Sequence, residues 1–202
     1  MTSWVRRTTV TSLALLMASA LTPVGAAHAT DTRDRAAGVT VAVVDMAFSK
    51  PSVAVPLGGT VTWRFGDSMN HSTTSDSDFW DSGLQSDGDT WARAFTSSGS
   101  FGYHCSTHDD MRGRVQVRPT ASGTPTAGYT VRWATKRTSG TALDVQVRTG
   151  SGRWATWLAS TSSLSGRFDR AGTATWQIRA RTRDTTTRAV SGWSPVVRVA
   201  VR

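Results

Sequence analysis

Hydrophobic and polar residues alternate along short segments of this chain. The clearest segments are VTVAVV (39–44), TVTWRF (60–65), TWARAF (90–95), RVQVR (114–118), YTVRW (129–133), DVQVR (144–148), TWQIRAR (175–181) and VVRVAV (196–201). A period of two with β-branched and aromatic residues is typical of strands that bury one face, and Gly, Pro, Ser and Asp clusters separate the segments. We therefore predict an all-β protein built of two tandem β-sandwiches.

Charge divides these strands into two groups. Residues 31–119 hold 8 basic and 11 acidic side chains, whereas residues 120–202 hold 13 basic and 3 acidic ones, so the net charge of +9 belongs to the second half. The seam RPTASGTPTAG (118–128) has the composition of a linker. We predict a first domain over 30–118, a linker over 119–127 and a second domain over 128–202.

The N-terminal segment has the pattern of a secretory signal peptide. Arg6 and Arg7 precede an apolar run (10–21), and Ala27 and Ala29 supply a small-x-small cleavage pattern. The run is shorter than the ~20 residues that a membrane-spanning helix needs, and no second such run follows. We predict cleavage after Ala29, a secreted or extracytoplasmic protein and no transmembrane segment. General secretion ranks above the twin-arginine route, which stays open.

The stretch YHCSTHDDM (103–111) holds the one cysteine of the chain, Cys105. A lone cysteine in an exported protein is a buried apolar filler, half of an intermolecular disulfide or a metal ligand. His108 and Met111 follow it at +3 and +6, on what we expect to be a loop between two strands. A thiolate, an imidazole and a thioether together favour copper over hard cations.

A trigonal copper site with two imidazoles requires a second histidine. His104 adjoins Cys105 in a strand, so its side chain is expected on the opposite face. His71 lies in the polar turn DSMNHSTTS after the strand 60–65, which suits a loop at the same end of a sandwich. Zinc is the rival metal, but it gains little from a thioether, so Met111 favours copper.

Residues 39–118 resemble the cupredoxins, the small type 1 blue copper proteins such as amicyanin and plastocyanin. The resemblance rests on Y-H-C-x-x-H-x-x-M-R-G-x-V-x-V, on GGTVTW (58–63) and on the approach DSGLQSDGDTWARAF (81–95). It implies a Greek-key β-sandwich. It also implies one copper ion with these ligands: His71, Cys105 and His108 in the plane and Met111 on the axis. Ser72 stands where many relatives have an asparagine that ties the two ligand loops together.

The resemblance implies an electron carrier, not an enzyme, with His108 as the port for electrons. Asp109 and Asp110 beside it make an acidic rim, which favours a redox partner protein with a cationic docking face. The alternative is an extracytoplasmic copper-binding, storage or adhesive protein with no electron-transfer role.

Residues 128–202 resemble a fibronectin type III domain, on YTVRWAT, DVQVRTGSGRWATW, ATWQIRARTRD and SGWSPVVRVAV. No clear first strand precedes Tyr129. Alternation places a set of arginines on outward faces: Arg132, Arg148, Arg179, Arg181 and Arg183. They are either a solvated basic face or an attachment site for an anionic cell-surface polymer. Nucleic acid is not expected, because no recognition motif is present.

Overall fold

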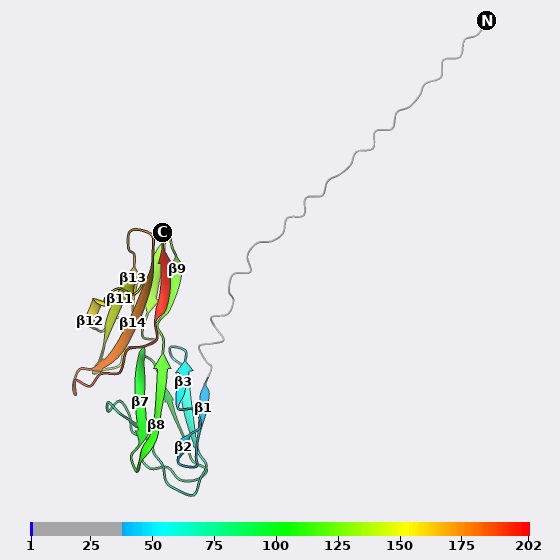
Figure 1. Ribbon diagram of the computed structural model, residues 1–202, viewed down its shortest axis with the longest axis vertical. Coiled ribbons are helices and arrows are strands. Elements are labelled where there is room, and N and C mark those ends of the chain that lie inside the picture. Colours follow the sequence, from blue (N-terminus) through cyan, green and yellow to red (C-terminus); the bar gives the residue numbers. More distant parts are fainter. Residues whose placement is uncertain (2–37) are drawn as a thin grey trace.

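The computed structural model describes Met1 and residues 38–202. The predicted signal peptide (1–29) lies outside the described residues. Within them the chain forms strands and turns without any helix, so no described segment could cross a membrane as a helix. Figure 1 shows the strands gathered in two layered bodies that stack end to end along the long axis. The prediction of an all-β protein with tandem sandwiches is confirmed.

Eight strands build the first sandwich: β1 (Val39–Val44), β2 (Ala47–Phe48), β3 (Ser52–Val55), β4 (Thr60–Phe65), β5 (Thr74–Ser75), β6 (Thr90–Ala94), β7 (Gly99–Cys105) and β8 (His108–Val117). One sheet has the order β2-β1-β4-β6 and the other β3-β8-β7-β5, with β1 parallel to β4 and β3 parallel to β8. Alternate residues of β4 and β7 are buried, and Trp63 and Tyr103 meet edge to face at 5.4 Å in the core. The alternation thus fixes which face of each sheet is internal.

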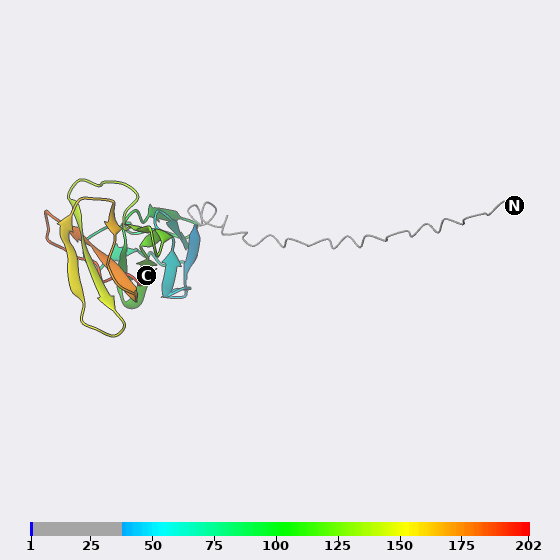
Figure 2. The same cartoon turned by 90° about the horizontal axis from the view of Figure 1, so that it is seen from above.

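Seven strands build the second sandwich: β9 (Thr120–Thr124), β10 (Gly128–Arg132), β11 (Thr141–Thr149), β12 (Ala155–Thr161), β13 (Ser165–Phe168), β14 (Ala174–Asp184) and β15 (Val197–Val201). Their sheets have the orders β13-β10-β9 and β12-β11-β14-β15. Trp133 is fully buried in its core, with Val145 and Ile178. Figure 2, along the long axis, shows the yellow and orange strands of this sandwich.

The expected linker (119–127) contains a strand. Thr120–Thr124 forms β9, which pairs antiparallel with β10. Only Arg118 and Pro119 separate β8 from β9, so the chain passes almost directly from one sandwich to the other. The first strand of the second sandwich, which could not be recognised in the sequence, therefore lies in the segment that we had interpreted as a linker. Its residues are small and mostly exposed, and such residues give no hydrophobic alternation.

The two sandwiches are joined by hydrogen bonds as well as by the chain. Ser100 and Gly192 exchange two backbone hydrogen bonds of 2.9 and 2.8 Å. The Ser98 amide donates to the Trp133 carbonyl at 2.8 Å, and the Thr182 hydroxyl donates to the Ser98 carbonyl at 2.9 Å. Ser98, Trp133 and Thr182 are buried, so breaking their bonds would leave buried polar groups without partners, and these bonds resist relative motion of the sandwiches. The junction lies at the N-terminal end of β7.

Candidate metal centre

Three side chains converge at the end of the first sandwich that lies away from the junction with the second. Cys105 ends β7 and His108 begins β8, so only Ser106 and Thr107 lie between the two strands. The sequence predicted a longer loop, up to residue 113, but the antiparallel ladder continues through His108 with an irregularity beside Cys105. His71 follows β4 and is held by a bridge to Gln85, with backbone hydrogen bonds of 3.0 and 2.8 Å.

The donor atoms form a compact triangle. The Nδ1 atoms of His71 and His108 are 3.0 Å apart, and Sγ of Cys105 lies 3.8 Å from the first and 3.4 Å from the second. The centre of such a triangle is about 2 Å from each corner, close to the bond lengths that a metal ion makes with imidazole and thiolate. Among the described residues this is the one group of three or more His, Cys, Asp or Glu side chains positioned for a metal.

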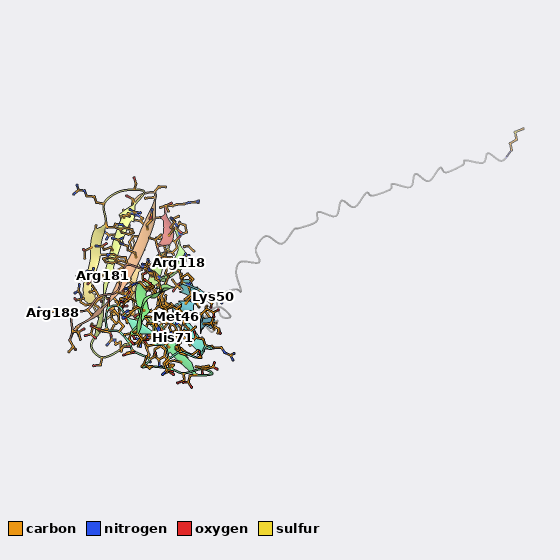
Figure 3. The ribbon with its side chains drawn as sticks, turned by 60° about the horizontal axis from the view of Figure 1, so that its bottom comes forward. Met46, Lys50, His71, Arg118, Arg181 and Arg188 are labelled. Atoms are coloured by element: carbon orange, nitrogen blue, oxygen red, sulfur yellow. The ribbon has the colours of Figure 1, made fainter. Side chains whose placement is uncertain are left out.

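Burial differs among the three residues. His71 and Cys105 are 0% and 1% exposed, whereas His108 is partly exposed. Figure 3 labels His71 in the lower part of the molecule, within the first sandwich. A metal ion bound here would be shielded from water on the His71 side. The ring of His108 would be the ligand that links it to the protein surface.

Asp67 orients the buried histidine. Its two carboxylate oxygens lie 3.0 and 2.9 Å from Nε2 of His71. Nε2 therefore carries the proton and donates a hydrogen bond to the carboxylate. This leaves the lone pair of Nδ1 directed at the site. The backbone amide of Met69 donates to Asp67 at 2.8 Å and is the main reason that the pKa of this carboxyl is lowered. Asp67 was not among the residues predicted from the sequence, where its only signal is its position four residues before His71 in a polar turn.

Hydrogen bonds favour the thiolate of Cys105. Burial raises the pKa of the thiol, but bonds from Thr107 and from the Ser72 amide outweigh burial, and the pKa falls to about 6. The Ser72 amide is 3.3 Å from Sγ, and the Thr107 hydroxyl is also 3.3 Å away. The thiolate is the form that binds a metal, so these bonds prepare the sulfur for that role.

Ser72 also ties the two ligand segments together. Its hydroxyl accepts from the Ser106 amide at 2.8 Å and bonds to the Ser106 hydroxyl at 3.0 Å, and it bonds to Thr74 at 2.9 Å. Ser72, noted in the sequence as a departure from the resemblance, thus makes the cross-link itself. The connection between the His71 and Cys105 segments is kept with a shorter side chain.

The remaining sequence candidates are placed as follows. Met111 is 2% exposed, on β8 three residues after His108, and belongs to the core of the first sandwich. His104 lies outside the triangle, and its Nδ1 is 2.7 Å from the carboxylate of Asp76 on the outer face. The structure thus brings together His71, Cys105 and His108 and directs His104 elsewhere.

Comparison with known proteins finds similarity over the first sandwich only. Residues 36–118 match the sequence model of copper binding proteins of the plastocyanin/azurin family. No curated protein matches the chain. Among solved structures, a reduced Cu(I) form of a proline-to-glycine variant of amicyanin at pH 4 is 27% identical over 40% of this chain and 81% of its own, with a TM-score of 0.38. An oxidised methionine-to-leucine variant of amicyanin is 26% identical over 39% and 80%, with the same TM-score.

The family match covers the strands and all of the converging side chains described above. The second sandwich lies outside it. Residues 36–118 are thus similar in sequence to copper binding proteins of the plastocyanin/azurin family, and His71, Cys105 and His108 are positioned within them as a ligand set for one copper ion.

Proposed function

We propose that this protein is an exported type 1 copper protein that carries single electrons. The observation that supports this most directly is the triangle of one thiolate and two imidazole nitrogens at the end of a cupredoxin sandwich. Two nitrogens and one sulfur in a plane are the donor set of blue-copper electron-transfer sites. Copper held there supplies one-electron redox chemistry.

Met111 completes the proposed ligand set as the weak axial ligand. Its burial and its position on β8 beside the His108 turn support this role. A thioether is a soft donor, which suits copper better than zinc. A site with three strong ligands and one weak one has no open position for a substrate, so the proposal is a carrier and not an enzyme.

His108 is the proposed port for electrons. It is the one partly exposed member of the triangle, and exposed Asp109 and Asp110 follow it. These carboxylates would attract a redox partner with a cationic docking face and would raise the association rate at low salt. Changing both to Asn should slow reduction by that partner at low salt, with little change at high salt. An unchanged rate at low salt would contradict the steering role.

The position of the second sandwich suits an attachment module. The junction contains Gly99, at the opposite end of β7 from Cys105, and six residues of strand span roughly 20 Å. In Figure 1 the second sandwich stacks on the first beyond the β8 arrowhead, which leaves the β7–β8 turn free at the other end. The strand orders β13-β10-β9 and β12-β11-β14-β15 support a fibronectin type III-like sandwich. We propose that it fixes the protein to an anionic cell-surface polymer after export.

The alternative function is copper storage or delivery outside the cytoplasm. The two functions differ in what happens to the metal. A carrier of electrons should pass through repeated cycles of chemical reduction and reoxidation in the presence of a copper chelator and keep its copper. A storage protein should lose copper to the chelator in the reduced state. Copper content after ten or more cycles, measured on the desalted protein, separates them.

A further inference from the structure

Arginine and tryptophan side chains alternate on the outer face of the sheet β12-β11-β14-β15. The guanidinium of Arg179 lies 3.9 Å from the ring centre of Trp154 and 4.5 Å from that of Trp193. Arg148 lies 4.4 Å from Trp154 on one side, and Arg181 lies 4.7 Å from Trp193 on the other. Stacking on indole rings holds these guanidiniums in fixed positions, so a ligand would bind them with little loss of side-chain entropy.

Positive charge on this face exceeds the negative charge beside it. Asp144 accepts hydrogen bonds from Arg181 at 2.9 Å and from Arg183 at 2.7 Å. Arg148 and Arg179 donate only to neutral glutamine side chains. One carboxylate therefore accompanies four guanidiniums, which leaves an excess of three positive charges in the row.

A cavity of about 200 Å³ opens on the same face. It is lined by the carboxylate of Asp144 together with Gln146, Thr156, Ala159, Arg181, Arg183 and Trp193. The side chains of Arg181 and Arg183 are 28% and 29% exposed, so both remain accessible to a ligand at the cavity.

The guanidiniums also repel one another. Burial lowers the pKa of Arg179, and the positive charges of Arg148 and Arg181 lower it further. An anion placed among the three would relieve this repulsion. The outward positions of β14 recur every second residue, so Arg179, Arg181 and Arg183 repeat along the strand at roughly 7 Å.

We propose that this arginine–tryptophan face binds a linear acidic polysaccharide, whose carboxylates lie along the row of guanidiniums. The regular row of fixed cations matches a polymer that repeats its negative charge along its length. Gln146 and Thr156 offer polar groups to sugar hydroxyls. The proposal rests on the attachment role proposed above for the second sandwich and does not depend on copper.

Two other polyanions fit this face less well. Single-stranded nucleic acid is held by stacking of bases on open aromatic faces, but arginines already occupy the faces of Trp154 and Trp193. Peripheral binding to a membrane uses apolar side chains that enter the lipid. In the described chain, the exposed large hydrophobic residues all lie before residue 120: Met1, Met46, Met69 and Leu84.

The test measures binding of the full mature protein to polygalacturonate, with uncharged dextran as the reference, at about 50 mM and about 200 mM salt. We expect binding to polygalacturonate only, weakened by salt. Arg181→Gln/Arg183→Gln should weaken it about tenfold at the lower salt, because two charge-assisted contacts are lost. Arg132→Gln/Arg167→Gln removes the same charge from the outer face of the opposite sheet and should change it less than about twofold.

Arg148→Gln/Arg179→Gln is a second variant for the case in which loss of both partners of Asp144 unfolds the domain. Equal weakening by the control pair, absence of binding to polygalacturonate, or tighter binding to anionic lipid vesicles or to an oligonucleotide would overturn the proposal. The absorption of the copper-loaded protein reports separately on the metal site. An intact copper site with no polysaccharide binding therefore rejects this proposal alone.

Discussion

The carboxylate of Asp67 is hydrogen-bonded to the imidazole of His71 on the side of the ring opposite Cys105. Both of its oxygens lie within 3.0 Å of Nε2, and Nδ1 of the same ring faces the sulfur at 3.8 Å. The carboxylate thus fixes both the tautomer and the direction of a buried ring before any metal arrives. Orientation by a partner of this kind strengthens the ligand.

Asp67→Asn should weaken copper binding about tenfold, because a neutral amide holds the Nε2 proton less strongly and removes a negative charge from the site. Competition titration against a chelator measures the affinity. Nitrogen NMR of the metal-free protein should show that His71 loses its single tautomer.

Asp76→Asn is the matched control, because it makes the same change at a carboxylate–histidine pair outside the triangle. Equal loss of affinity in both variants would contradict the role of Asp67.

Ser72→Ala should destabilise the first sandwich by about 1 kcal/mol, because the Ser106 amide loses its acceptor and the two ligand segments lose their link. Copper should also exchange faster, since the segments can separate. Urea unfolding and the rate of copper loss to a chelator measure the two effects. Ser77→Ala, in a nearby turn, should leave both unchanged; faster exchange in that variant as well would point to a general loosening.

The sequence could supply the candidate metal-binding residues but not the residues that hold them in place. Cys105, His108 and Met111 lie within seven residues and have distinctive chemistry, so spacing alone singled them out. Asp67 and Ser72 are common polar residues in a turn, and only the folded chain shows that one reaches His71 and the other reaches Ser106.

Thr182→Val should loosen the junction between the sandwiches. The Thr182 hydroxyl bonds to the Ser97 hydroxyl at 2.8 Å and to the Ser98 carbonyl at 2.9 Å, and valine keeps the shape without these bonds. We expect a loss of about 1 kcal/mol in urea unfolding and faster amide exchange at Ser98 and Ser100.

Thr175→Val, an exposed position on the same strand, is the control and should leave both quantities unchanged. Unaltered amide exchange in Thr182→Val would show that the junction does not depend on this side chain.

Asp144→Asn should destabilise the second sandwich by about 2 kcal/mol at pH 7, because two guanidiniums lose their carboxylate. Burial raises the pKa of Asp144, but the Ser160 amide and the two arginines outweigh burial and hold it below its ordinary value of 3.8. This stabilisation is therefore complete above the unfolded-state pKa and is lost as the pH falls through the folded-state pKa. Urea denaturation measures the difference in free energy of unfolding between wild type and variant, which should shrink from pH 7 to strong acid. A difference that persists in strong acid would contradict this role of Asp144.

Strand positions followed from alternation wherever large side chains fill one face. VTVAVV became β1 and TVTWRF became β4 with the expected bounds. β9 gave no such signal because TASGT has little to bury and is held by its pairing with β10. The passage between the sandwiches was therefore expected as a linker, although backbone hydrogen bonds to the next strand, β10, make it part of a sheet.

Cys105, His71 and His108 are expected to bind one copper ion together, and titration of the purified mature protein with Cu(II) measures this. We expect an intense visible absorption from the thiolate–copper bond that saturates at one equivalent and disappears in Cys105→Ser. Absence of this band in the wild-type protein, or its persistence without the thiol, would show that the three residues do not form a type 1 copper site.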